Sequence, residues 1–282
     1  MARTRAELSV CGTAVRENDP DRFFCTLFAR QEEREALFAL YTFNHELARV
    51  AESVSEPMLG QIRLQWWRES LDGIEAGTPR RHDTVDALAE TWSQGFDRNL
   101  LESMVDAREA DLSSDPPETL DQLIAYGRNT SGALMFQAAS LIDQNAARHE
   151  EVCRDAGVAV ALSGLLRSTV ALGSNGRTVF PLEMLSKLRL DPRDILKGEH
   201  NDRVSRLTEE IAACALDHAS RARRLGRKLA KPMVPALLPL AFATRDLATL
   251  RGNGYNPFDA ALTRNSGGRQ LAVLGRMLLG RF

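Results

Sequence analysis

One segment limits the fold more than any other, because its apolar residues repeat with the period of an α-helix. Between residues 31 and 54, apolar side chains recur at steps of four and three: Ala36, Leu40, Phe43, Leu47, Val50 and Val54. Steps of this size place all of them on one face of a helix with 3.6 residues per turn. We therefore expect one helix over residues 31–54 that buries this face in a core.

The remaining sequence repeats this pattern as helix after helix. The chain has 282 residues and is rich in Ala, Leu, Glu and Arg, which lose little side-chain freedom in a helix. Runs of β-branched residues, which would indicate strands, are missing. Short Pro, Gly and Asp clusters break the pattern, and none is long enough to link two domains. The sequence therefore predicts a single all-α domain over residues 1–282, with about eight to eleven helices.

Charge and cysteine usage exclude several classes of function. The formal net charge is −2, so neither nucleic acid nor another polyion is expected as a partner. The cysteines lie in no CxxC pair and read as reduced, buried thiols rather than zinc ligands: Cys11, Cys25, Cys153 and Cys214.

The same sequence gives an expectation for location. No apolar run reaches the roughly 20 residues that span a bilayer, and the first eight residues lack the apolar core of a signal peptide. We expect a soluble, cytoplasmic bacterial protein without a cleaved segment. Peripheral contact with the inner membrane is compatible with this location. The Arg-rich start leaves the mitochondrial matrix as the less favoured alternative.

The segment 164–183, GLLRSTVALGSNGRTVFPLE, carries the most specific motif. It resembles the second signature of the squalene/phytoene synthase family, N-I-L-R-D-x-x-E-D-x-x-x-G-R-x-Y-L-P. Arg167, Gly176-Arg177 and Phe180-Pro181 fit that frame without a gap. Where the family places its metal-binding acids, this chain has Ser168, Ala171 and Leu172.

The family's first acidic motif is altered as well. The chain matches its A-L-Y-A-F lead-in at Tyr41 and Phe43, but has Ala48, Arg49 and Glu52 at the positions of D-D-x-x-D. Carboxylates at i and i+4 share one helix face, and two such helices hold the Mg²⁺ ions that neutralise a diphosphate. With this pair broken, we expect no metal site, no catalytic residue and no cofactor. Mg²⁺ would be the cofactor only under the synthase alternative.

The resemblance implies a prenyl-synthase (isoprenoid synthase) fold with a central cavity. We expect the helix at 31–54 and the helix ending near Val170 to face each other across it, with Arg167 within reach of Glu52 or of a shared ligand. The alternative for Glu52 is an ion-pair network with Glu46 and Arg49 on one helix. The candidate cavity or ligand residues are Tyr41, Asn44, Ala48, Arg49, Glu52, Arg63, Trp66, Arg167, Ser168 and Arg177.

One branch of the family matches better than the synthases. Residues 41–57 and the following Ile62-Arg-Leu-Gln-Trp66 resemble the synthase-like assembly factors of respiratory complex I, which read F-N-x-E-L-A-x-V-x-D-S-V-S-E and then M-R-x-Q-F-W. The family match is strongest over residues 19–185, whereas 204–282 matches only in helical character and in the helix that contains Pro235 and Pro239.

This closer resemblance implies a function. It suggests a non-catalytic assembly factor beside a membrane, with subunits or assembly intermediates of complex I as partners. Two alternatives remain: a prenyltransferase that condenses two prenyl diphosphates to a C30 or C40 isoprenoid, and a non-catalytic protein that binds an isoprenoid or lipid.

A run of basic residues near the carboxyl end has two interpretations. It is either a solvated helix face or a surface for a membrane or an acidic partner. The run comprises Arg221, Arg223, Arg224, Arg227, Lys228 and Lys231.

Overall fold

The protein is all-α in the part of the chain that the computed structural model describes, residues 8–263, 267–278 and 282, which contains no strand. This confirms the predicted fold class. The helices are α1 (Val10–Asn18), α2 (Pro20–Thr26), α3 (Gln31–Ala48), α4 (Pro57–Glu75), α5 (Asp83–Thr91), α6 (Arg98–Ala107), α7 (Leu120–Gly127), α8 (Ala133–Ile142), α9 (Glu150–Arg167), α10 (Thr169–Ser174), α11 (Leu182–Lys187), α12 (Pro192–Leu196), α13 (Asp202–Leu225), α14 (Val234–Leu237), α15 (Pro239–Gly252) and α16 (Gly267–Leu278).

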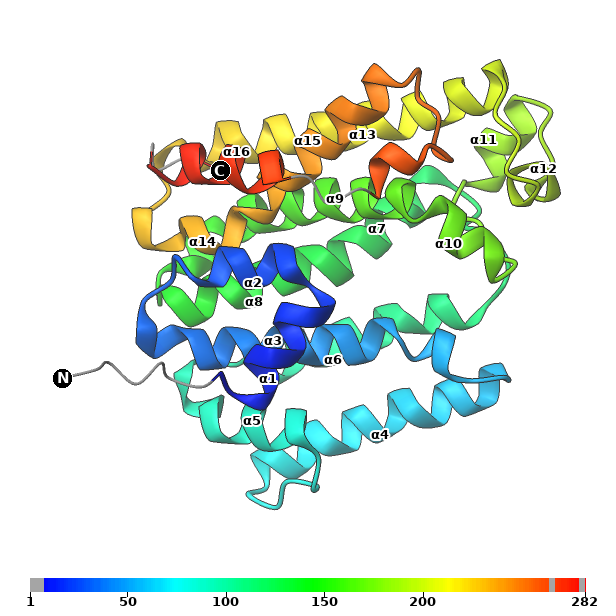
Figure 1. Ribbon diagram of the computed structural model, residues 1–282. Coiled ribbons are helices and arrows are strands. Elements are labelled where there is room, and N and C mark those ends of the chain that lie inside the picture. Colours follow the sequence, from blue (N-terminus) through cyan, green and yellow to red (C-terminus); the bar gives the residue numbers. More distant parts are fainter. Residues whose placement is uncertain (1–7, 264–266, 279–281) are drawn as a thin grey trace.

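The long helices lie side by side, from α13 at the top of Figure 1 through α9, α8 and α3 to α4 at the bottom. One core cluster joins α3, α4, α5, α6 and α8, with Phe43 and Leu64 fully buried in it. A second cluster joins the end of α9 to α13 and α15. Helix α9 therefore lies between the two clusters, and its last turn reaches the pocket described below.

A very close helix crossing fixes the position of α9. A π-helical turn, η4 (Arg128–Gly132), precedes α8 and packs against α9. A Cβ atom on Gly157 would lie 2.2 Å from Cα of Gly132, so only glycine fits at position 157. This contact holds α9 in one register against α8.

Helix α3 ends six residues earlier than expected, so the prediction of one helix to residue 54 was wrong at its carboxyl end. Arg49 caps the helix, and a short 3-10 turn, η1 (Ala51–Ser53), follows. The apolar stripe itself is buried as expected up to Val50. Pro57 begins α4 and holds Glu56 in an extended conformation, which prevents one continuous helix through this region.

None of the four cysteines is part of a disulfide bond. All four cysteines are free, and Cys11, Cys25 and Cys153 are buried while Cys214 is half-buried. Burial raises the pKa of the Cys153 thiol to about 12, so it stays protonated and unreactive near neutral pH.

Among the described residues, no single helix has the length and apolar character needed to cross a membrane. In the same described part of the chain, the pair Lys231–Leu237 and Pro239–Gly252, bent by 45°, meets those two criteria when taken together. Most of the side chains in this pair are buried in the protein core.

Candidate functional site

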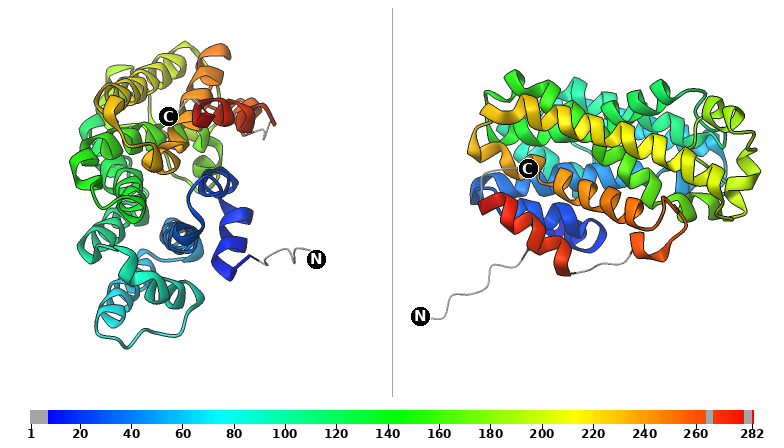
Figure 2. Two further views of the ribbon diagram at one scale, coloured as in Figure 1. Left: turned by 90° about the vertical axis from the view of Figure 1, so that its left-hand side faces the viewer. Right: turned by 90° about the horizontal axis from the view of Figure 1, so that it is seen from above.

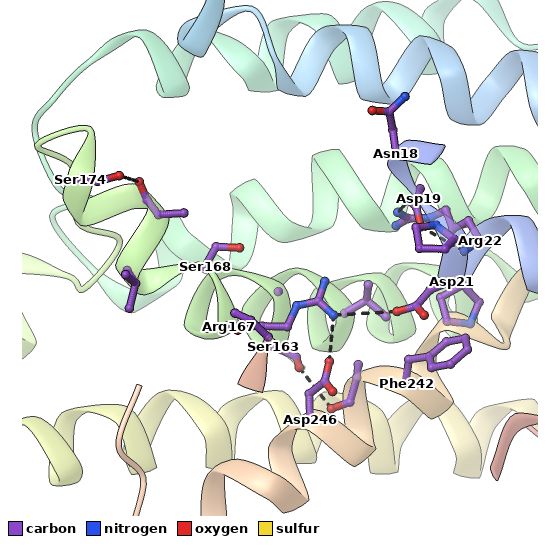
Figure 3. A pocket seen from close by; sticks show the side chains of 18 residues that line it. Asn18, Asp19, Asp21, Arg22, Ser163, Arg167, Ser168, Ser174, Phe242 and Asp246 are labelled. Carbon is purple, nitrogen blue, oxygen red and sulfur yellow. Dashed lines mark hydrogen bonds and ion pairs between the residues drawn. The ribbon is translucent and has the colours of Figure 1, made fainter. Parts of the chain in front are cut away.

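A pocket of about 550 Å³ opens between α2, α9, α10 and α15 (Figure 3). Val160, Pro239, Phe242 and Ala243 give it an apolar wall. The other side chains that matter for its chemistry are charged or polar: Asp19, Asp21, Arg22, Ser163, Arg167, Ser168 and Asp246.

The start of α2 brings two carboxylates to this pocket. Asp19 is the N-cap of α2, and its side chain accepts a hydrogen bond of 3.0 Å from the backbone N–H of Arg22. Pro20 occupies the first helical position, where its missing N–H costs nothing. Asp21 therefore lies in the first turn of α2, on the pocket wall.

The guanidinium of Arg22 already has partners on both sides. It forms an ion pair of 2.5 Å with Asp19, and it lies 5.8 Å from the centre of the Tyr41 ring. Burial raises the pKa of the Tyr41 hydroxyl. Tyr41, one of the expected cavity residues, thus packs behind Arg22 rather than lining the pocket itself.

Arg167 is the last residue of α9 and joins three helices. Its Nη1 atom lies 3.2 Å from Oδ2 of Asp246 on α15 and 3.8 Å from Oδ2 of Asp21 on α2. Ser163, one turn earlier, donates a 3.1 Å hydrogen bond to the carbonyl of Ala243. Figure 3 shows Arg167 between Asp21 and Asp246 on the wall of the pocket.

The expected contact between Arg167 and Glu52 was wrong. Glu52 is exposed and forms no ion pair within the described part of the chain, and neither does Arg49, so the alternative network with Glu46 is also missing. The reason is the early end of α3, which moves Glu52 out of the helix.

A second polar cluster, the Asp111 cluster, is formed by Asn44, Arg108, Asp111, Tyr126 and Arg177. Tyr126 Oη lies 3.0 Å from Asp111 Oδ2, and Arg177 Nη2 lies 3.0 Å from Asp111 Oδ1. Arg108 donates hydrogen bonds of 2.8 Å to Tyr126 Oη and 3.4 Å to Asn44 Oδ1. Burial raises the pKa of the Tyr126 hydroxyl, so Tyr126 is a neutral donor to Asp111. The cluster attaches the chain at Arg177 to α3 and α7.

Sequence reasoning found two members of this cluster, Asn44 and Arg177, and missed the other three. Arg108, Asp111 and Tyr126 lie in stretches that resemble the family. Their residue types carry no metal-ligand spacing, so only the three-dimensional structure brings them together.

The remaining expected residues lie in different places. Ser168 lines the pocket, whereas Ala48 does not, and no residue of α3 does. Arg63 is exposed and donates a 3.0 Å hydrogen bond to Ser53 Oγ. Trp66 packs edge-on against Trp67 and lies outside the pocket.

The donors near the pocket do not suit Mg²⁺. A Mg²⁺ site needs several oxygen ligands in octahedral geometry. Within the described residues, no group of three or more His, Cys, Asp or Glu side chains is placed to hold a metal ion. Asp19 is engaged by Arg22, and Asp21 and Asp246 are engaged by Arg167.

Comparisons with known proteins identify the family. The squalene/phytoene synthase family model matches residues 15–272. A Bos taurus protein named NADH dehydrogenase (ubiquinone) complex I, assembly factor 6, is 26% identical over 260 residues, which cover 91% of this chain and 77% of that protein. Phytoene synthase 1, chloroplastic, of Zea mays is 23% identical over 272 residues, which cover 93% of this chain and 66% of that enzyme.

A solved structure confirms the expected fold. A dehydrosqualene synthase in complex with a ligand matches with a TM-score of 0.83 and 16% identity, covering 95% of this chain and 94% of the other. The arrangement of helices is therefore that of the isoprenoid synthases, while the acidic motifs have been replaced. On this evidence the chain belongs to the squalene/phytoene synthase family.

Proposed function

We propose that this protein is a non-catalytic member of its family that acts as an assembly factor for respiratory complex I. Relatives named for that role match 91% of the chain in Bos taurus and 81% in Homo sapiens. We place the protein in the bacterial cytoplasm, at the membrane surface, with complex I subunits or assembly intermediates as its partners.

The observation that carries the proposal is the neutralised Arg167. A prenyl diphosphate carries several negative charges and needs cations that are free to approach it. Here the guanidinium of Arg167 lies 3.2 Å from Asp246 and 3.8 Å from Asp21, so its positive charge is already balanced by carboxylates of the protein. Arg22 is likewise paired with Asp19. An anionic head group entering this pocket would meet three carboxylates.

The replaced acidic motifs support the same conclusion. Metal-assisted ionisation of a diphosphate needs carboxylates on two facing helices. At positions where the family carries these acids, the chain has Ala48 at the end of α3 and Ser168 directly after α9. A prenyltransferase with this lining would need a different way to bind two diphosphates, and the described residues offer no cluster of oxygen ligands for one.

A second candidate function rests on the apolar wall of the pocket. Its volume of about 550 Å³ lies within the usual range for small-molecule sites, about 300–1,000 Å³. Val160, Phe242 and Ala243 suit a hydrocarbon chain, and Ser163, Ser168 and Ser174 suit a hydroxyl group. A neutral isoprenoid alcohol or lipid would fit this lining better than a diphosphate.

Deleting the gene in its host tests the proposal. We expect less assembled complex I on native gels, with carotenoid, hopanoid and sterol precursors unchanged. Wild-type protein supplied in trans should restore the complex. A deletion strain with normal complex I and missing C30 or C40 isoprenoids would favour the prenyltransferase instead.

A further inference from the structure

A strip of unpaired cations lies where α13 passes into α14. It consists of Arg224 at the end of α13, Arg227 and Lys228 in the 3-10 turn η6 (Gly226–Lys228), and Lys231 at the start of η7 (Lys231–Met233). All four side chains are exposed. None of them forms an ion pair or hydrogen bond in the part of the chain that is described.

The other two cations of the same run are used inside the protein. Arg221 Nε lies 2.9 Å from Asp155 Oδ2, and Arg223 donates hydrogen bonds to the carbonyl of Phe282 and to Thr244 Oγ1. Of the six basic residues in this run, two thus contact groups of the protein, and four are exposed without a partner in the described chain. A solvated helix face explains the four exposed cations poorly, because exposed cations usually alternate with acids.

Apolar side chains are exposed beside these cations. Leu225, within the strip, is 49% exposed, and Leu27, in the turn between α2 and α3, is 42% exposed. The two loops share one edge, because Leu229 and Phe28 pack against the same small core cluster. Figure 1 shows this edge at the left end of the helices, and the left view of Figure 2 faces it.

Nearby acids do not cancel the charge of the strip. Glu32 and Glu33, at the start of α3, are paired with Arg30, the N-cap residue of that helix. At the start of α9, Glu150 is paired with Arg154, and Glu151 with Arg128. The cations of the strip are therefore left to an external partner.

We propose that this edge, defined by Leu27, Arg224, Leu225, Arg227, Lys228 and Lys231, binds the surface of an anionic phospholipid bilayer. Cations attract the head-group phosphates, while the leucine side chains enter the boundary between head groups and acyl chains. The combination of unpaired cations with exposed leucines favours a bilayer over a purely acidic protein segment, which would need no apolar contact. The inference deepens the proposed location at the membrane surface, and its test on vesicles does not depend on a role in complex I assembly.

Vesicle sedimentation with the full-length protein tests this surface. The probes are vesicles of phosphatidylcholine alone and vesicles that contain about 30 mol% phosphatidylglycerol. We expect binding only to the anionic vesicles, weakened by high salt because screening shortens the range of the attraction. The variant Arg224→Gln/Arg227→Gln/Lys228→Gln/Lys231→Gln should bind about tenfold more weakly or worse, and Leu225→Ser about fivefold more weakly.

A charge-matched control separates the strip from net charge. Four exposed arginines without ion pairs are spread over other surfaces: Arg16, Arg81, Arg206 and Arg251. Changing all four to Gln alters the net charge equally, from −2 to −6, and should leave vesicle binding unchanged. Circular dichroism must show that both variants are folded.

Three results would overturn the proposal. They are equal binding by both quadruple variants, no binding of the wild type to anionic vesicles, and binding to polyglutamate but not to vesicles. The last result would assign the strip to an acidic protein partner.

Discussion

At the scale of single residues, Arg167 is the side chain on which the proposed function depends most. It joins α9 to α15 and α2 through Asp246, which is 10% exposed, and Asp21. We expect Arg167→Ala to lower the free energy of unfolding by about 1 kcal/mol, since the guanidinium is partly exposed and its pairs are screened. Chemical denaturation would measure the change.

The matched control for Arg167 is Arg224→Ala on the exposed end of α13. Arg224 has no partner in the described chain, so its replacement should change stability by less than about 0.5 kcal/mol. Arg223 is unsuitable as a control, because it is half-buried and hydrogen-bonded to Thr244. Equal unfolding midpoints for Arg167→Ala and wild type would mean that the pairs contribute nothing to stability.

The sequence identified Arg167 and Ser168 as pocket residues but could not identify the partners of Arg167. Asp246 lies 79 residues further along the chain, on α15. Asp21 lies in a stretch that does resemble the family, yet its contact depends on how α2 is placed against α9. Such pairings follow from tertiary packing, which one sequence does not specify.

At the scale of elements, the crossing of α9 with the turn before α8 should tolerate no side chain. Alanine at position 157 would favour a helix by about 1 kcal/mol, but its Cβ would lie 2.2 Å from Gly132 Cα. We expect Gly157→Ala to destabilise the protein by about 2–4 kcal/mol, because two backbones must move apart. Urea denaturation would measure this.

The same helix provides the control for that prediction. A Cβ atom on Gly164 would meet nothing within 4 Å, so Gly164→Ala should be neutral or stabilise by up to about 1 kcal/mol. Similar unfolding curves for the two variants would show that the crossing is loose.

Helix content was predictable from the sequence because the periodic stripes are long and the breaks contain Pro or Gly. The end of α3 was not, since apolar residues continue in register to Val54 while the backbone turns at Arg49. The pattern predicts which residues are buried rather than where the helix ends: Val50 is buried although α3 has already ended, and Val54, after the 3-10 turn, is half-buried.

At the scale of the whole molecule, the chain keeps the fold of the family while its two acidic motifs are replaced. The chain keeps the helix arrangement of a dehydrosqualene synthase with a TM-score of 0.83. Its pocket presents carboxylates that are paired with the protein's own arginines. We therefore expect no Mg²⁺-dependent binding of farnesyl diphosphate, because a metal would have to displace Arg22 or Arg167 from their acids and still lack ligands.

Calorimetric titration of the purified protein measures this directly, with farnesyl diphosphate added in the presence and absence of Mg²⁺. Farnesol serves as the matched ligand, because it has the same hydrocarbon chain with a neutral hydroxyl in place of the diphosphate. Binding of farnesol alone would support the isoprenoid-binding candidate, since the apolar wall at Phe242 and Val160 would then hold the chain. Tight binding of the diphosphate that requires Mg²⁺ would contradict the non-catalytic assignment, because the ion pairs of Arg22 and Arg167 would then have to open on ligand binding.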